Sequence, residues 1–155
     1  MTDPVLRILL PLVLSLGMGT AQTPSLTGAW DLNVAKSNWG KKAKPQSVEV
    51  TIEHSEPDLK YSGVAVDAQE HTRHFEFAGK IDGKEYPVTR EYGEGKITLK
   101  RAKPATLNSE FRSTDGRFVE LATTTLSKDG KTLTRQMRLK SPDGNLSWTE
   151  IYEKR

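Results

Sequence analysis

The sequence predicts an all-β fold, a single antiparallel up-and-down (meander) barrel of about eight to ten strands. Short runs rich in Val, Thr and aromatic residues recur at roughly even spacing, which is typical of barrels and sandwiches. Asp-Gly pairs, the strongest short-range signal for a type I′ hairpin turn, separate several of these runs. The pairs are Asp82-Gly83, Asp115-Gly116, Asp129-Gly130 and Asp143-Gly144. No segment carries the apolar period of an amphipathic helix, so we expect strands throughout.

The composition favours a barrel over a solidly packed sandwich. Hydrophobic residues make up only 35% of the chain, and a solid two-layer core needs many large apolar groups to pack closely. We therefore expect an interior that is partly polar or hydrated. The chain has no cysteine, so burial and backbone pairing must hold the domain together, and thiol chemistry is excluded.

The first segment of the chain has the pattern of an export signal. Arg7 precedes an apolar run over residues 8–14, and small residues ending at Ala21 offer a cleavage site. A membrane anchor is the alternative, but the uncharged run over residues 8–22 is shorter than the roughly 20 residues of a spanning helix. We expect export to the periplasm or the extracellular space with cleavage near Ala21, which leaves residues 22–155 as one barrel domain.

The first strands follow from alternation of apolar and polar residues. Residues 27–34 place Trp30 and two aliphatic residues on one face, and residues 47–54 alternate Val and Ile with Glu and Thr. The segment between them is rich in Lys, Gly and Pro, so we expect a loop. Residues 59–66 form the next strand, with a bulge or bend expected at Gly63.

The middle of the chain continues the pattern with two strands around Asp82-Gly83. Residues 73–80 place two Phe side chains on one face. The Asp-Gly pair predicts a hairpin to the short strand over residues 85–89. Pro87 lacks a backbone donor, so this strand is expected at an edge or beside a bulge.

The last part of the chain reads as a ladder of antiparallel strands. Strands are expected over residues 96–101 and 106–113, followed by three more that two tight turns connect. Those three occupy residues 117–127, 132–139 and 146–155. The ladder predicts a meander that ends the domain.

The two ends of the domain resemble a known group of barrels. Thr27-Gly28-Ala29-Trp30 resembles the Gly-x-Trp opening of the calycins, which include the lipocalins and the fatty-acid-binding proteins. Residues 148–154, Trp-Thr-Glu-Ile-Tyr-Glu-Lys, resemble the last strand of fatty-acid-binding proteins. With its export pattern, the chain looks most like small secreted bacterial lipocalin-like proteins of unknown function. The resemblance implies a barrel closed by pairing of the first strand with the last.

The resemblance also implies how the closure is built. In that family the first-strand Trp covers one end of the barrel and packs against a basic residue near the C-terminus. Gly28, Trp30, and Lys154 or Arg155 would take these places here. A cation over an aromatic ring adds about 0.5–1 kcal/mol at an exposed site. A ligand contact is the alternative role of Trp30.

The last strand departs from the family at one position. Fatty-acid-binding proteins usually carry an Arg two residues before the Tyr, where it clamps a carboxylate. This chain has Glu150 there and keeps Tyr152. A buried carboxylate repels an anionic head group unless it is paired or protonated.

Parity along the last two strands identifies the candidate ligand-binding residues. Trp148, Glu150 and Tyr152 share one face of the last strand, and Arg135 belongs to one face of its hairpin partner. If both faces point inward, Arg135 and Glu150 form an ion pair in a binding cavity. The alternative is a cross-strand pair on the surface, worth about 0.2–1 kcal/mol.

Other possible sites carry weaker signals. His71 and His74 are three residues apart, which on a strand points them to opposite faces, so no metal site is expected. Four lysines surround Trp39 in the first loop. They make either a basic lip with an aromatic tip that touches an anionic envelope surface or a solvated loop at the barrel mouth.

The sequence favours a ligand-binding role over catalysis. It contains no nucleophile elbow, phosphate loop or zinc-protease motif, and no cofactor is expected. The net charge of +3 is spread among interspersed residues, so no nucleic-acid partner is expected. We expect a monomer that binds a small lipophilic or amphipathic ligand. The alternative is an envelope or interaction protein whose barrel is filled by its own side chains.

Overall fold

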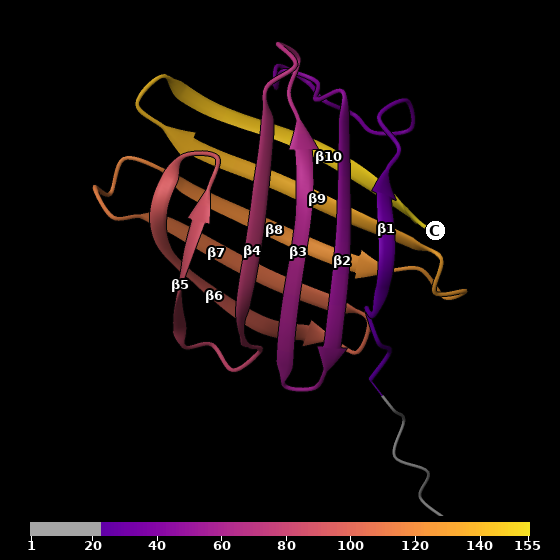
Figure 1. The fold of residues 1–155 in the computed structure, drawn as a ribbon. Coiled ribbons are helices and arrows are strands. Elements are labelled where there is room, and N and C mark those ends of the chain that lie inside the picture. Colours follow the sequence, from indigo (N-terminus) through magenta and orange to yellow (C-terminus); the bar gives the residue numbers. More distant parts are fainter. Residues whose placement is uncertain (1–22) are drawn as a thin grey trace, which may run out of the picture.

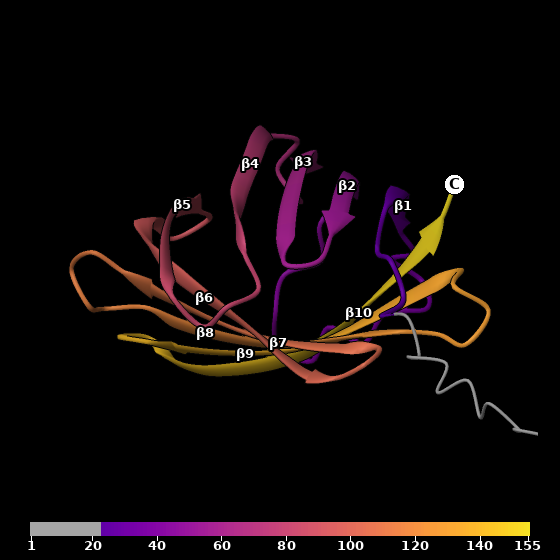
Figure 2. The same cartoon turned by 90° about the horizontal axis from the view of Figure 1, so that it is seen from below.

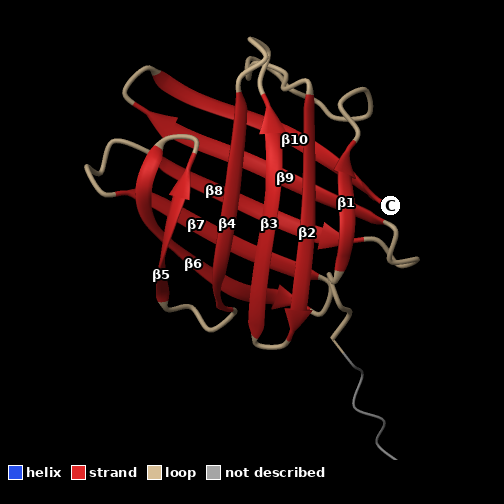
Figure 3. Ribbon diagram, in the orientation of Figure 1, coloured by secondary structure: helices blue, strands red, loops and turns tan. Residues whose placement is uncertain are grey.

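The computed structural model describes residues 23–155 and shows one ten-stranded antiparallel sheet curled into a nearly closed barrel (Figure 1). The predicted fold class is confirmed. The predicted export signal, residues 1–21, lies outside the described residues. Strands and connecting loops account for the whole described chain (Figure 3). The strands are β1 (Gly28–Leu32), β2 (Ser47–Ser55), β3 (Asp58–Val66), β4 (Thr72–Lys80), β5 (Glu85–Arg90), β6 (Gly93–Lys103), β7 (Thr106–Ser113), β8 (Val119–Leu126), β9 (Thr132–Ser141) and β10 (Gly144–Lys154).

The strand order makes two walls that face one another. The order is β4-β3-β2-β1-β10-β9-β8-β7-β6-β5, so all strands that are neighbours in sequence pair with each other except β4 and β5. β1 pairs with β10, which joins the two ends of the domain. β4 and β5 end the order and are not hydrogen-bonded to each other. Figure 2 shows the walls β1–β4 and β6–β10 on opposite sides of the interior.

The prediction of a hairpin at Asp82-Gly83 is wrong, because β4 and β5 are not hydrogen-bonded to each other. The turn is held by other partners: Asp82 accepts a hydrogen bond from the Tyr86 hydroxyl at 2.7 Å, and the Gly83 N–H donates to the Leu99 carbonyl at 2.9 Å. The ring of Tyr86 packs edge-on against Phe77, with centroids 6.4 Å apart. The Tyr86 side chain therefore connects β4 and β5, where backbone hydrogen bonds between the two strands were expected.

The Asp-Gly turns of the ladder form, but not as type I′ turns. Only the glycine has positive φ, 72° at both Gly116 and Gly130, whereas type I′ needs two such residues. The Asp129 carboxylate instead accepts hydrogen bonds from the Ser127 hydroxyl at 2.6 Å and the Lys131 N–H at 3.0 Å. Asp115 makes the same two bonds with Ser113 and Arg117. Asp side chains that bond nearby backbone are a second way to fix a turn.

Two further expectations concern β3 and β5. A bulge or bend was expected at Gly63, and no bulge forms there, because the pairing of β3 with β2 and β4 runs without a shift. A Cβ at Gly63 would collide with the Glu49 carbonyl and the Phe75 ring, so the glycine makes room for both. Pro87 lies on an edge strand, as predicted, since β5 pairs only with β6.

The closure of the barrel is built around Trp30. Its side chain is fully buried, and its indole N–H donates to the Leu26 carbonyl at 2.9 Å. Lys154 lies over the ring, with Nζ 5.5 Å from the centroid. Gly28 has a φ of 150°, and a Cβ there would lie 2.5 Å from Lys154 Cε. Arg155 takes a different place, since it pairs with Asp31 and does not stack on Trp30.

The interior contains two apolar clusters with polar groups between them. One surrounds Trp30 and Phe111, and the other contains Trp39, Met137 and Trp148. Charged side chains also point inward, so the expectation of a partly polar interior is correct.

Candidate functional site

The interior of the barrel holds a cavity of about 460 Å³. Three segments border its mouth: the loop between β1 and β2, the β3–β4 turn and the β5–β6 turn, which lie at the same end of the barrel (Figure 1). Strand residues line the deeper part. They include Val48, Tyr61, Ala65, Phe75, Arg90, Glu120, Arg135, Met137, Trp148, Glu150 and Tyr152. Ligand pockets commonly have this size and this mixture of apolar walls with few polar groups.

Arg135 and Glu150 form an ion pair inside the barrel. They lie directly opposite each other on β9 and β10, and Arg135 Nη1 is 2.9 Å from Glu150 Oε2. Their side chains are only 22% and 13% exposed. The alternative of a surface pair is therefore wrong, because the inward faces of both strands carry the pair.

Glu150 accepts hydrogen bonds from two more side chains of its own strand. The Trp148 indole N–H donates to Oε1 at 2.8 Å, and the Tyr152 hydroxyl donates to Oε2 at 3.2 Å. Residues two apart on a strand point to the same face, which is why Trp148 and Tyr152 flank the carboxylate. All four sequence-predicted binding residues thus come together at one point of the cavity wall.

A second ion pair lies in the same cavity and was missed by sequence reasoning. Arg90, the last residue of β5, pairs with Glu120 of β8 and donates to the Tyr61 hydroxyl at 3.3 Å. The Glu120 side chain is only 7% exposed. Arg90 is two residues from Val88, and Glu120 is two residues from Ala122, so each charged residue shares a strand face with an apolar one. This alternation was the signal that could have identified Arg90 and Glu120.

The surroundings of both arginines raise their pKa values. Burial has the largest single effect on Arg90 and lowers its pKa, but the charge of Glu120 and the interactions with Tyr61 and Glu150 together raise the pKa above its ordinary value. Burial likewise has the largest single effect on Arg135 and lowers its pKa, but Glu150, Tyr152 and Glu120 together raise the pKa above its ordinary value. Burial, followed by the charge of Glu150, raises the pKa of Tyr152. Both guanidinium groups stay protonated, and each has a carboxylate beside it.

Lys42 lies across the cavity mouth. Its Nζ is 2.9 Å from the Glu91 carboxylate of the β5–β6 turn. The same atom lies 5.5 Å from the centroid of the Trp148 ring and 5.6 Å from that of Tyr92. Its side chain is only 15% exposed, so the ammonium group is enclosed by a carboxylate and two aromatic rings.

Of the two interpretations of the first loop, the one with an exposed aromatic tip is wrong. Trp39 is buried in the cluster with Met137 and Trp148, and its indole N–H donates to the Val34 carbonyl at 3.1 Å. Lys36 pairs with Glu153 at 2.5 Å. Two of the four loop lysines, Lys36 and Lys42, therefore form ion pairs with the barrel.

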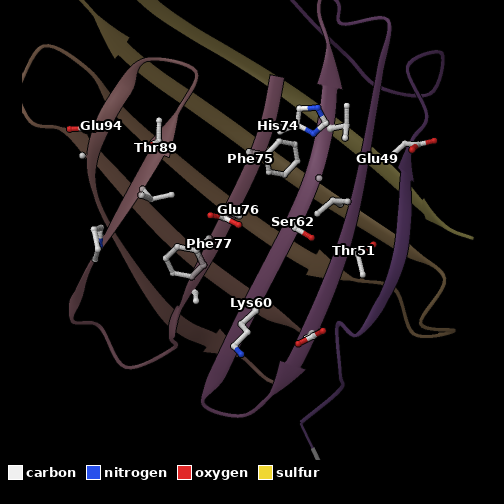
Figure 4. A pocket seen from close by; sticks show the side chains of 18 of the residues that line it. Glu49, Thr51, Lys60, Ser62, His74, Phe75, Glu76, Phe77, Thr89 and Glu94 are labelled. Atoms are coloured by element: carbon white, nitrogen blue, oxygen red, sulfur yellow. The ribbon is translucent and has the colours of Figure 1, made fainter. Parts of the chain in front are cut away.

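A larger hollow of about 1560 Å³ extends over the outer face of β2–β4 toward the β4–β5 gap (Figure 4). Exposed polar side chains such as Glu49, Ser62, His74 and Glu76 lie on this face (Figure 4). It is a surface groove without buried charged groups, so the interior cavity is the better candidate site.

No metal site is apparent in residues 23–155, where no group of three or more His, Asp or Glu side chains converges. His71 lies in the β3–β4 turn beside Asp67, and His74 lies on the outer face of β4. Among the same residues there is no helix with the length and hydropathy of a membrane span.

Comparison with known proteins identifies the fold. No protein-family model matches the sequence, and no curated protein sequence matches it. A Schistosoma mansoni fatty acid binding protein in complex with arachidonic acid matches with a TM-score of 0.58 and 12% identity, over 86% of this chain and 98% of that one. A zebrafish ileal bile acid-binding protein complexed with cholic acid matches with a TM-score of 0.57 and 14% identity, over 84% and 100%. At these identities the similarity shows a shared barrel fold.

Proposed function

We propose that this chain, which shares its barrel fold with fatty-acid-binding proteins, binds a small, partly apolar molecule in the interior cavity. The observation that carries the proposal is a cavity of about 460 Å³ that combines apolar walls with a polar cluster. This volume lies within the roughly 300–1,000 Å³ of ligand sites. The two similar structures were solved with arachidonic acid and cholic acid bound, which supports a lipophilic ligand.

Four residues are proposed to contact the ligand. Trp148 and Tyr152 offer aromatic surface, and Arg135 and Glu150 offer polar anchors beside it. Trp30 has a different proposed role: it is fully buried beneath Lys154 and closes the barrel. The proposed role is non-catalytic binding.

The expected location is outside the cytoplasm. The apolar run after Arg7 and the small residues ending at Ala21 support export and cleavage. Expression of the full chain in a bacterial host, followed by N-terminal sequencing of the protein in the periplasmic fraction, tests this. A mature protein that begins near Gln22 is expected, and full-length protein in the cytosol would contradict it. Weak contact with an anionic envelope surface stays a prediction, supported only by the exposed Lys41 and Lys44 of the first loop.

Titration with the uncharged lipophilic dye Nile red tests the binding proposal. Saturable fluorescence enhancement is expected with the mature protein, together with quenching of Trp emission because Trp148 borders the cavity. Ala65→Phe fills the cavity from β3 and should weaken dye binding about tenfold or more. Ala78→Phe is the matched control, since Ala78 is exposed on the neighbouring strand.

The alternative is an envelope or interaction protein whose barrel is filled by its own side chains. Equal dye binding by the Ala65→Phe and Ala78→Phe proteins would place the dye outside the cavity. No saturable binding by the unmodified protein would favour the filled barrel and sink the binding proposal.

A further inference from the structure

The carboxylate of Glu150 occupies the donors that would otherwise attract an anion. Arg135, Trp148 and Tyr152 all border the cavity, and each donates a hydrogen bond to Glu150. The strongest anion-binding cluster of the cavity is therefore already filled by a group of the protein itself.

The second ion pair adds one positive and one negative charge to the deeper part of the cavity, so the charges of the two interior pairs balance. Glu120 pairs with Arg90 across the interior, so two guanidinium groups face two carboxylates. An ionised ligand acid would add a third carboxylate to a balanced, poorly hydrated cluster, where an unpaired charge is costly. A cationic ligand would be repelled by both guanidinium groups and by the Lys42 ammonium group at the mouth.

The unused hydrogen-bonding capacity of the cluster consists mainly of donors. A guanidinium group has five N–H donors and no acceptor. In the described chain, Arg135 makes a hydrogen bond through Nη1 alone, to Glu150. Spare N–H groups at the cavity wall are suited to an uncharged acceptor oxygen, as in a carbonyl, hydroxyl or ester group.

We propose that the cavity selects uncharged ligands that carry an acceptor oxygen, and that Glu150 sets this selectivity as the built-in counter-ion of Arg135. This inference rests on the proposed binding function and names the class of ligand. Glu150 lines the cavity, so its replacement should change the preference between a charged and an uncharged ligand of equal size. A general loss of structure would weaken the binding of both ligands alike.

A pair of probes with equal chain length tests the preference. We expect 1-dodecanol to displace Nile red from the unmodified protein at pH 7.5 about tenfold more tightly than dodecanoate does. The affinity for dodecanoate should rise between pH 7.5 and about pH 5, because acidification increases the fraction of the neutral acid. This pH series needs no variant and cannot be confused with a folding defect.

Glu150→Gln tests the assigned residue. The amide keeps the size of the side chain but removes the counter-ion of Arg135, so the affinity for dodecanoate relative to that for dodecanol should increase about tenfold or more. Glu153→Gln is the matched control. Glu153 lies on the outer face of the same strand, where it pairs with Lys36 outside the barrel. Circular dichroism and a thermal transition establish that each variant is folded.

The outcomes separate this inference from the proposed function. Tighter binding of dodecanoate than of dodecanol by the unmodified protein would overturn the selectivity and leave the binding function standing. An unchanged preference in folded Glu150→Gln would overturn the role of Glu150. The absence of saturable binding by Nile red and both probes would overturn the selectivity and the binding function together.

Discussion

His54 fixes the end of the barrel where the chain enters β1. Its side chain is 2% exposed, its Nδ1 accepts a hydrogen bond from the Leu26 N–H at 3.1 Å, and its Nε2 is 2.7 Å from Glu56. The backbone N–H can donate only to an unprotonated Nδ1, so the proton of the neutral ring lies on Nε2 and donates to Glu56. A single imidazole thereby links β2, the segment before β1 and the β2–β3 turn.

Replacement of His54 tests this link. His54→Ala leaves the buried Leu26 N–H without its partner, which should lower the free energy of unfolding by about 1–3 kcal/mol. Urea denaturation measures the change, and His74→Ala on the outer face of β4 is the control. Equal stability of the two variants would show that the His54 hydrogen bond contributes nothing measurable.

Glu56 should make part of the stability dependent on pH. Burial raises its pKa, but hydrogen bonds from Arg101 and His54 lower it more, so the folded-state pKa lies below the ordinary 4.5. A lowered carboxyl pKa stabilises the folded protein above that ordinary value, and the contribution is lost as the pH falls through the folded-state pKa. Thermal unfolding of Glu56→Gln between pH 7 and about pH 3 should show a deficit at pH 7 that shrinks in acid. A deficit that stays constant would contradict this.

At the scale of elements, the loop between β1 and β2 is fastened to the β5–β6 turn by Lys42. The Lys42–Glu91 pair and the two rings beneath it lie at the mouth of the cavity. Lys42→Met should therefore release a bound probe about threefold to tenfold faster, with a smaller change in equilibrium affinity. Stopped-flow displacement of Nile red measures the rate. Lys41→Met, an equal loss of charge on an exposed neighbour, should leave the rate unchanged.

Strand positions were largely predictable because their signal is local. Period-two alternation identified the strands from residues 47–54 to the end of the chain within a few residues. The gap between β4 and β5 was not predictable, because Asp82-Gly83 carries the same local signal as Asp129-Gly130. What differs is the tertiary partner: Tyr86 and Leu99 hold the first turn, and the second closes on itself.

The candidate site was predictable only in part. Parity predicted that Arg135 and Glu150 could meet across two adjacent strands. A sequence does not say, however, which face of a weakly apolar strand points inward. Arg90 was missed because the predicted strand ended one residue earlier, at Thr89. Glu120 was missed because its alternation with Ala122 is a weak signal in a strand rich in Thr, where a lone carboxylate is ordinarily expected on the outer face.

At the scale of the whole molecule, the continuity of the wall decides where the barrel opens. β1 and β10 are hydrogen-bonded to neighbours on both sides, whereas β4 and β5 each lack one neighbour. Amide hydrogen exchange should be at least about tenfold faster for the gap-facing amides of β4 and β5 than for those of β1 and β10. Nuclear magnetic resonance resolves these groups individually. Uniform protection around the barrel would mean that β4 and β5 are joined in solution.

The same gap leaves one edge of β4 and one edge of β5 unpaired. A strand with an unpaired edge is a template onto which another chain can add, and natural proteins guard such edges with charges and proline. β4 carries Arg73 and Lys80, and β5 carries Glu85 and Pro87, which has no N–H to offer. The barrel can thus remain open along one seam without that seam becoming a site of intermolecular strand addition and aggregation.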